Sequence, residues 1–323
     1  MLFEGVQNAE DAGASKFVFM LDLRRHSTQG LDPDLHRFAG PAFVVADDGS
    51  GFEKHDWTSL QNLHASVKQD SPSEIGSFGM GTRSYFHYTD VVFVASKNIF
   101  VGLDPLEIVS HEGGWMLDTS IKSEADDARR KGVDFCNVPN LDFPEKGSIF
   151  RLPLRLKEPV AGSFGTEVTE AKAREMLDDF AKQLASGEML LFLSNVTCIE
   201  LWLWEHDAVE PKLVEQVHKT FVKTSESWGG RRLPYWVSDD SRKCYKALAA
   251  QLLEMDDNSR DHYFSLVSQA VVETKEFSSG QTRRWFIAQR FDTRVDLAAL
   301  ISSCRTVPIV GVAGIFIYMY ICI

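Results

Sequence analysis

The feature that most constrains the fold is an apolar segment that runs directly into a glycine turn. Residues 42–46 (AFVVA) are rich in β-forming side chains, and residues 47–51 (DDGSG) follow without a gap. Such residues favour a buried strand, and Asp-Gly and Ser-Gly are common turn dipeptides. The pattern predicts a strand that ends in a tight turn. At this turn Asp47, beside the bare backbone of Gly49 and Gly51, could accept a hydrogen bond from a flat ligand, although a plain turn explains the same residues.

A second glycine cluster, formed by Gly76, Gly79 and Gly81, precedes a segment that predicts a helix through His87. Glycines before a helix leave backbone N–H groups accessible and add the positive end of the helix dipole, so together they bind anionic phosphate without a basic side chain. The spacing is neither that of the dinucleotide-binding fingerprint nor that of the P-loop. Taken alone, the cluster is also typical of a flexible loop.

The N-terminal residues place a carboxylate and an amide on one face of a predicted helix. Residues 2–13 have apolar side chains at helical spacing, and Glu4 and Asn8 lie four residues apart, with Asp11 nearby. Residues four apart lie one turn apart on the same helix face. Taken singly, such a pair is also typical of a solvated polar face.

A fourth feature, Gly147-Ser148, opens an alternating segment that predicts a strand over residues 148–156. The Ser148 hydroxyl could complete a ligand edge, or the pair could form an ordinary turn. The remaining predicted strands are 16–23, 91–96, 98–103, 189–193, 198–204, 271–277 and 282–290, and the remaining helices are 56–67, 169–186 and 241–255. The order predicts an α+β fold up to about residue 157 and, after a looser stretch at 158–163, a second α/β domain.

In this order, the four features resemble the nucleotide-binding motifs of the GHKL superfamily, which includes the ninety-kilodalton heat-shock chaperones and the histidine kinases. Further segments narrow the resemblance to the chaperone-like ATPase region of the sacsin/Nov type; they are residues 7–12, 25–28, 40–43, 78–81, 87–91, 103–105 and 150–155. The resemblance implies a Bergerat-type two-layer α/β sandwich over residues 1–157. Its sheet would be mixed and mostly antiparallel, with helices on one face, and a second α/β domain would follow over residues 163–323.

The resemblance also implies a role for each motif residue. ATP and Mg²⁺ are the implied ligands, with Asn8 as the metal ligand and Glu4 as the general base. Asp47 would accept a hydrogen bond from the exocyclic amine of adenine, with Ser148 supporting the same edge. The other implied cofactor-binding residues are Asp11, Gly49, Gly51, Gly76, Gly79 and Gly81. Residues 52–75 would form a lid.

The implied function is an ATP·Mg²⁺-binding, chaperone-like module with weak ATPase activity, in which nucleotide state moves the lid and the second domain. The alternative is a catalytically inactive scaffold for protein–protein interaction. Only three residues precede Glu4, so we expect the chain to be truncated at its N-terminus relative to the family, with Glu4 on a fraying helix end. Binding is therefore expected more strongly than hydrolysis.

Composition narrows the expected partners and compartment. The chain has 46 acidic and 34 basic residues and a net charge of -12, which opposes non-specific binding to nucleic acid or anionic lipid. We expect ATP and client or co-chaperone proteins as partners. The five scattered cysteines, without a C-x-x-C pair, indicate a reducing, cytoplasmic location and no zinc site. For the apolar residues 307–323, a core strand that is cut short, or an artefactual end, is favoured over a membrane anchor because Pro308, Gly311 and Gly314 interrupt a helix.

Overall fold

The computed structural model describes residues 2–58, 60, 84–138, 146–157, 159, 162–191, 193, 195–224, 267–290 and 316–320. The chain forms two compact units: Met1–Ala185 with Cys198–Gln216, and Ser186–Thr197 with Val217–Ile323. The domains expected from the sequence, 1–157 and 163–323, stay a prediction. The helix and strand at Glu170–Ala185 and Cys198–Trp204, which were expected in the second domain, lie in the first compact unit.

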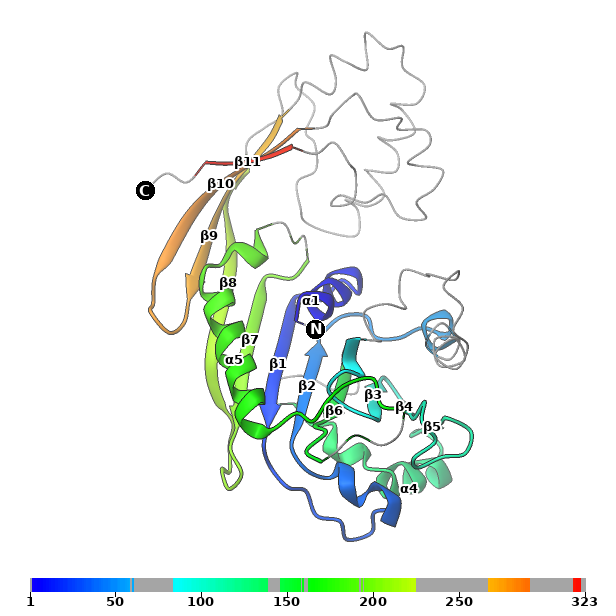
Figure 1. The fold of residues 1–323 in the computed structure, drawn as a ribbon. Helices are drawn as coiled ribbons and strands as arrows, with labels where there is room; N and C mark the ends of the chain where they lie inside the picture. Colours follow the sequence, from blue (N-terminus) through cyan, green and yellow to red (C-terminus); the bar gives the residue numbers. More distant parts are fainter. Residues whose placement is uncertain are drawn as a thin grey trace. The chain divides into compact units, whose positions relative to one another are not determined.

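The first unit is built on a mixed sheet with the strand order β7-β1-β2-β6-β3-β4-β5 (Figure 1). The strands are β1 (Lys16–Asp22), β2 (Ala42–Asp47), β3 (Val92–Ser96), β4 (Ile99–Leu103), β5 (Gly114–Asp118), β6 (Ser148–Pro153) and β7 (Cys198–Trp204). Within this order each pair of neighbours is antiparallel, except that β1 and β7 are parallel. The predicted α+β fold with a mixed, mostly antiparallel sheet is therefore confirmed.

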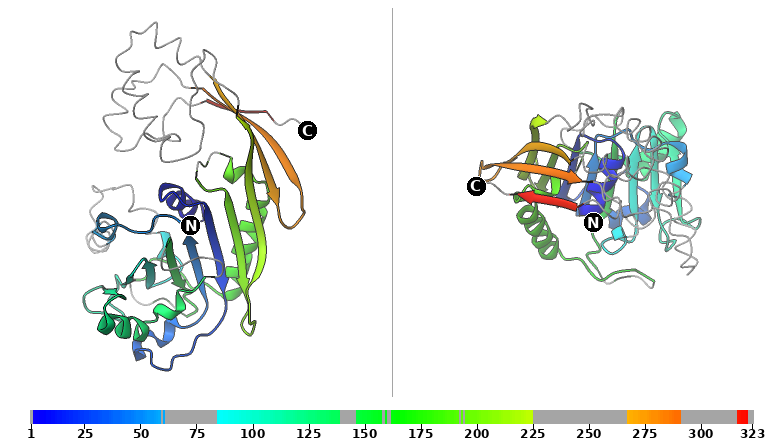
Figure 2. Two further views of the ribbon diagram at one scale, coloured as in Figure 1. Left: turned by 180° about the vertical axis from the view of Figure 1, so that it is seen from behind. Right: turned by 90° about the horizontal axis from the view of Figure 1, so that it is seen from above.

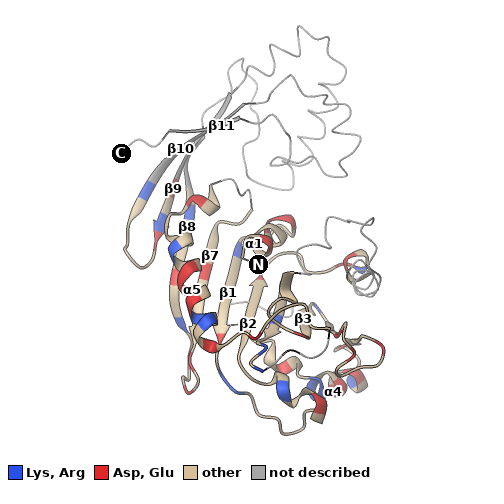
Figure 3. Cartoon of the chain, in the orientation of Figure 1, with Lys and Arg blue, Asp and Glu red and all other residues tan. Residues whose placement is uncertain are grey.

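Two helices, α1 (Leu2–Asp11) and α5 (Glu170–Ala185), pack on one face of this sheet (Figures 1 and 2). A Cβ atom added at Gly5 of α1 would lie 2.9 Å from the ring of Phe17 and 3.1 Å from Val45, so α1 rests directly on β1 and β2. On α5, the ring of Phe180 meets Phe19 of β1 edge-on, with 5.1 Å between centroids. Acidic and basic residues are intermixed along α5, as the red and blue segments of Figure 3 show, which is typical of a helix with a solvated face.

The opposite face of the sheet holds a continuous apolar core. Short elements cover it: η1 (Pro33–Phe38), α4 (Lys122–Arg130) and η2 (Val133–Phe135). The buried strand residues of this core are Val18, Met20, Val44, Ala46, Phe93, Ala95 and Ile149. These positions alternate with those that face α1 and α5, as the pleat of a strand requires. Neither β5 nor α4 was predicted from the sequence.

The second unit contains η3 (Glu188–Leu190), most of β8 (Lys212–Thr224), β9 (Val267–Glu276), β10 (Thr282–Arg290) and β11 (Phe316–Tyr320). The predicted β9–β10 hairpin is confirmed, and β11 pairs antiparallel with β10, as the core-strand interpretation of residues 307–323 expects. No helix in the described part of the chain is long and apolar enough to cross a membrane. The helix predicted over residues 241–255 lies outside the described residues.

The strand predicted over residues 189–193 is wrong, because the chain forms the 3₁₀ turn η3 there. Gly187 begins the turn with φ +74°, a conformation that glycine adopts without strain. The buried Lys219 ammonium then donates hydrogen bonds to the carbonyls of Leu190 (2.9 Å) and Leu193. The apolar residues of this segment are typical of a strand. Here, however, the carbonyls of Leu190 and Leu193 accept from Lys219 and not from a neighbouring strand.

Candidate functional site

Asp47 belongs to a row of polar residues that crosses three neighbouring strands. In the sheet register Asp47 of β2 pairs with Ser148 of β6, which in turn pairs with Ser96 of β3. Directly opposed residues project from the same face of a sheet. The next row on that face is apolar and consists of Val45, Phe150 and Val94. Because α1 packs on Val45, the polar row lies on the face that α1 covers.

The carboxylate of Asp47 is buried with little to neutralise it. The residue is 9% exposed, and its one hydrogen bond within the described ranges comes from the Gly49 N–H to Oδ1, at 2.8 Å. Burial raises the pKa of Asp47 to about 6; the Gly49 bond opposes this shift and the charge of Asp48 adds to it. A buried carboxylate without a cation is costly unless further donors reach it. Asp47 is therefore a ready acceptor for an N–H group of a ligand.

Close packing explains the glycines that follow Asp47. A Cβ atom at Gly49 would lie 2.8 Å from the Cβ of Ala12 and 2.9 Å from its carbonyl oxygen, so the loop passes directly against the end of α1. Gly51 has φ +69°, and a Cβ there would lie 2.8 Å from Ser96 Oγ. The turn predicted from the sequence is present, and both glycines are sterically required.

Gly147 is the tightest of these positions. It has φ +86°, and a Cβ atom there would overlap the carbonyl oxygen of Asp47, at 1.9 Å. The Gly147 N–H also donates to the Gly49 carbonyl at 2.9 Å. Only glycine therefore lets the start of β6 approach the end of β2 this closely. Ser148, which follows, is the register partner of Asp47, and its role at a ligand edge stays a prediction.

Ser96 is a residue of this site that the sequence did not reveal. Its hydroxyl donates to the Gly147 carbonyl at 2.8 Å, accepts from the Phe52 N–H at 2.9 Å and lies 3.2 Å from Ser148 Oγ. Ser96 thus links the residue after Gly51 to Gly147, which precedes β6. The sequence placed it at the end of a predicted strand, but gave no sign that this strand neighbours β6.

The three polar residues predicted on α1 differ in exposure. Asn8 is partly buried, whereas Glu4 and Asp11 are exposed. The end of α1 is fixed to the turn after β2, because the Ser50 N–H donates to the Ala12 carbonyl at 3.0 Å. Asp48 strengthens this link by accepting 2.7 Å hydrogen bonds from the N–H groups after the helix, those of Ser15 and Lys16. The structure thus brings α1 and the Asp47 turn together.

Part of the predicted site is not described. Gly76, Gly79 and Gly81 lie outside the described residues, as do residues 61–75 of the expected lid. In the described part of the chain, no group of three or more His, Cys, Asp and Glu side chains could hold a metal ion. Asn8 as a Mg²⁺ ligand, like the other roles assigned from the resemblance, stays a prediction.

Tyr85 is a second site residue that the sequence did not reveal. It is 1% exposed, and its hydroxyl has no hydrogen-bond partner among the described residues. Its ring packs against Phe150, with 5.6 Å between centroids. Burial and the charges of Asp47 and Glu4 all raise the pKa of the hydroxyl above its ordinary value. Tyr85 therefore lies under the influence of carboxylates from both β2 and α1.

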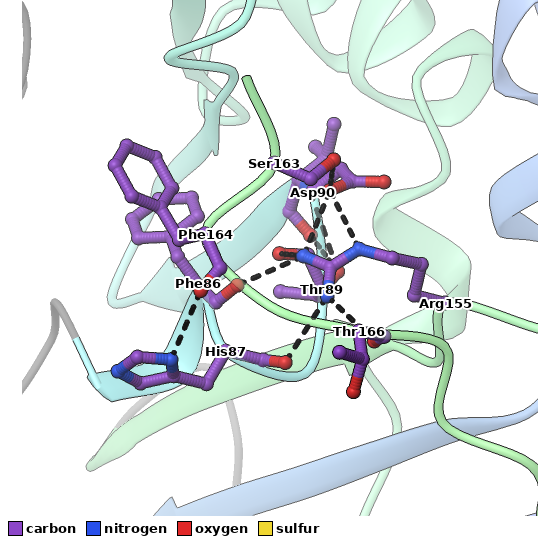
Figure 4. Close-up of polar contacts among 9 residues, drawn as sticks. Phe86, His87, Thr89, Asp90, Arg155, Ser163, Phe164 and Thr166 are labelled. Atoms are coloured by element: carbon purple, nitrogen blue, oxygen red, sulfur yellow. Dashed lines mark hydrogen bonds and ion pairs between the residues drawn. The ribbon is translucent and has the colours of Figure 1, made fainter. Parts of the chain in front are cut away.

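Arg155 anchors the segment that follows the glycine cluster (Figure 4). Its guanidinium is buried and pairs with Asp90 at 2.8 Å, and Ser163 Oγ donates to the same carboxylate at 2.8 Å. The backbone carbonyls that accept from Arg155 belong to Phe86, His87, Thr89 and Thr166. Residues 86–90 are thereby joined to residues 163–166, which lead into α5.

A family model decides the relationship of this chain to known proteins. The model of the Sacsin domain matches residues 1–216, more than half of the chain. The chain belongs to the Sacsin domain family. Within that family, human Sacsin is 29% identical over 331 residues, and the match covers 97% of this chain but 7% of that protein. The chain therefore spans only a small part of the length of this curated relative.

Among solved structures, the chain matches the ATPase domain of MutL from Aquifex aeolicus, which was determined in complex with ADP. The match covers 65% of this chain and 60% of that chain, with 13% sequence identity and a TM-score of 0.30. Similarity at this level supports neither a shared fold nor a shared function.

Proposed function

We propose that this Sacsin domain binds ATP·Mg²⁺ on the α1-covered face of the first unit and acts as a chaperone-like module. The observation that carries the proposal is Asp47, a buried carboxylate at a glycine-lined strand end. Its hydrogen-bonding capacity is nearly unused within the described ranges. Two further observations support it: Ser148 is the register partner of Asp47, and α1, which carries Glu4 and Asn8, packs on the same face of β2.

Adenine fits the residues around Asp47. Its exocyclic amine would donate to the carboxylate, and Ser148, the register partner of Asp47, would support the same edge, directly or through a water. Gly49 and Gly51 would support the site indirectly: their close packing against Ala12 and Ser96 holds the turn that carries Asp47 in place.

The phosphate end of the nucleotide would lie along α1 and the second glycine cluster. Asn8 would bind Mg²⁺ through its amide oxygen, with Asp11 one turn further along the same helix. Gly76, Gly79 and Gly81 would donate backbone N–H groups to the phosphates. Bound Mg²⁺ would neutralise part of the phosphate charge. Such a site needs no lysine, which suits a chain with a net charge of -12.

The proposal also includes weak hydrolysis of the bound ATP. Glu4 would act as the general base, accepting a proton from water on its carboxylate. Its exposed position in the first turn of α1 holds it loosely, since helix ends fray. This same observation favours the second candidate function, a scaffold that binds nucleotide without turnover and engages other proteins.

Coupling between nucleotide and the rest of the chain would use the lid and Arg155. Residues 52–75 would close over the nucleotide. Arg155 joins residues 86–90, after the second glycine cluster, to residues 163–166, before α5. A shift at the phosphate end would therefore pull directly on the residues before α5. Client or co-chaperone proteins are the proposed partners whose binding would depend on that movement.

Calorimetric titration with Mg²⁺ and a non-hydrolysable ATP analogue tests binding. We expect saturable heat from the wild-type chain, little or none from Asp47→Asn, and unchanged heat from Asp126→Asn, a matched exposed carboxylate on α4. Asn can still accept from Gly49, but it presents a neutral amide in place of the carboxylate. Equal binding by all three proteins would show that Asp47 does not contribute to nucleotide binding.

Phosphate release separates the two candidate functions. Release above background that Glu4→Gln abolishes, and that Glu175→Gln on α5 leaves intact, would support the ATPase. Binding without release would support the scaffold. Release that survives Glu4→Gln would exclude Glu4 as the base.

A further inference from the structure

The Tyr85 hydroxyl is a buried polar group to which the proposed site assigns no task. It is fully enclosed and has no partner within the described ranges. Buried polar groups are nearly always hydrogen-bonded, and an unpaired one destabilises the free protein. A ligand that supplies an acceptor at this point would therefore be preferred over one that does not.

Tyr85 packs on the sheet face that carries Asp47 and Ser148. Its ring packs on Phe150, which lies two residues beyond Ser148 and faces the same side of the sheet. Burial, and to a smaller extent the charges of Asp47 on β2 and Glu4 on α1, raise the pKa of the hydroxyl, so it stays protonated at neutral pH. Tyr85 thus offers a hydrogen-bond donor, while Asp47 offers an acceptor.

A donor next to an acceptor matches the edge of one purine. In adenine, the amine that would donate to Asp47 is flanked by two ring nitrogens, N1 and N7, that accept hydrogen bonds. Guanine places a carbonyl oxygen where that amine stands, and two acceptors would then face each other. We propose that Tyr85 Oη donates a hydrogen bond to a ring nitrogen of the bound adenine, beside the amine that Asp47 accepts. Tyr85 is then a specificity-determining residue; this inference rests on the proposed function.

The Tyr85→Phe variant provides the first test, since it removes the hydroxyl and keeps the ring on Phe150. We expect affinity for the non-hydrolysable ATP analogue to fall about five- to tenfold, the usual effect of losing one hydrogen bond. The unfolding midpoint of the ligand-free protein should stay unchanged or rise, because an unpaired buried hydroxyl is gone. The control is Tyr88→Phe, in the same segment, whose ring packs against Phe43 and whose loss of hydroxyl should leave affinity unchanged.

Analogues that replace one ring nitrogen by carbon provide the second test. With one of the two analogues, 7-deaza or 1-deaza, the ratio of the wild-type affinity to the Tyr85→Phe affinity should fall to about one, because that analogue lacks the ring nitrogen that accepts from Tyr85. A difference that persists undiminished with both forms would overturn the inference. So would equal affinity of wild type and Tyr85→Phe for the unmodified analogue. If wild type binds no ATP analogue at all, the proposed function fails and the inference falls with it.

Discussion

Two buried aspartates end neighbouring strands of the same sheet, and their surroundings are opposite. Asp22 ends β1 and Asp47 ends β2, at opposite ends of an antiparallel pair. Asp22 is fully buried, but Arg24 donates to both of its oxygens at 2.8–2.9 Å, and His26 Nε2 lies 3.3 Å away. Burial alone would raise the pKa of Asp22. The hydrogen bonds from Arg24, the nearby His26 ring and the charges of Arg24 and Arg151 hold the pKa of Asp22 well below its ordinary value.

The contrast separates a carboxylate that stabilises the fold from one that is available to a ligand. Asp22 has cationic partners, so it contributes stability as a charged group. Asp47 has a single backbone donor and a raised pKa, so its charge costs stability in the free protein. Strained or poorly satisfied groups are common at functional sites. The following predictions test this difference, from the largest expected effect to the smallest.

Asp22→Asn should destabilise the protein by about 3–5 kcal/mol, because it removes the carboxylate that compensates the partly buried charge of Arg24 and the buried charge of Arg151. Urea unfolding at neutral pH measures this loss. Asp126→Asn, an exposed carboxylate on α4, should change stability by less than about 0.5 kcal/mol. A loss below about 1 kcal/mol for Asp22→Asn would mean that Asp22 contributes no more than an exposed residue.

Gly147→Ala should destabilise by about 3 kcal/mol, since the new Cβ atom would overlap the Asp47 carbonyl in a left-handed conformation. Gly13→Ala is the matched control. Gly13 has a similar φ, +69°, but no atom within 4 Å of the added Cβ, so about 1 kcal/mol is expected. Equal losses, measured by urea unfolding, would show that β6 does not approach β2 as closely as described.

Asp47→Asn should stabilise the ligand-free protein by about 1–3 kcal/mol at pH 7.5. The folded-state pKa, about 6, lies above the ordinary value of 3.8, so between these values the folded state binds more protons than the unfolded state. The contribution of Asp47 to stability therefore falls as pH rises through this window. Below about pH 4 the gain from Asn should vanish. A destabilised variant at pH 7.5 would show that the Asp47 charge is compensated after all.

Nucleotide affinity should weaken about tenfold between pH 7 and pH 5. Protonation of Asp47 near pH 6 removes the charged acceptor for the adenine amine, and one pH unit below the pKa corresponds to a factor of ten. Calorimetric titration across this range measures the effect, with the residual binding of Asp47→Asn as the reference. A nucleotide affinity that does not change between pH 7 and pH 5 would show that protonation of Asp47 does not affect binding.

The sequence predicted the parts of the fold that local pattern determines. The β1, β2, β7, β9 and β10 strands and both α1 and α5 follow from hydrophobic period and turn residues, and the structure has them within a few positions. The elements missed are β5, β8 and α4. Two of them lack such a pattern: β5 is half-exposed, and α4 has only Ala128 buried. The wrong strand at residues 189–193 depends on Lys219, a partner that local pattern does not identify.

Only those residues of the candidate site that belong to a recognisable sequence motif were predicted. Asp47, Gly49, Gly51 and Ser148 were identified because strand ends and glycines are visible in the sequence. Ser96 and Tyr85 were not, because their place depends on which strands are neighbours and on what buries a single hydroxyl. Strand order and burial are long-range properties, and neither is encoded in the spacing of nearby residues.

The most direct test of the central claim is the unfolding free energy of wild type and Asp47→Asn at pH 7.5, with and without Mg²⁺ and a non-hydrolysable ATP analogue. Nucleotide that binds only the folded state should stabilise wild type, by about 2.7 kcal/mol at a concentration one hundred times the Kd. Asp47→Asn should be more stable than wild type without nucleotide and gain nothing from it. A variant that gains as much from nucleotide as wild type would contradict the claim that Asp47 is held buried and under-paired for a ligand.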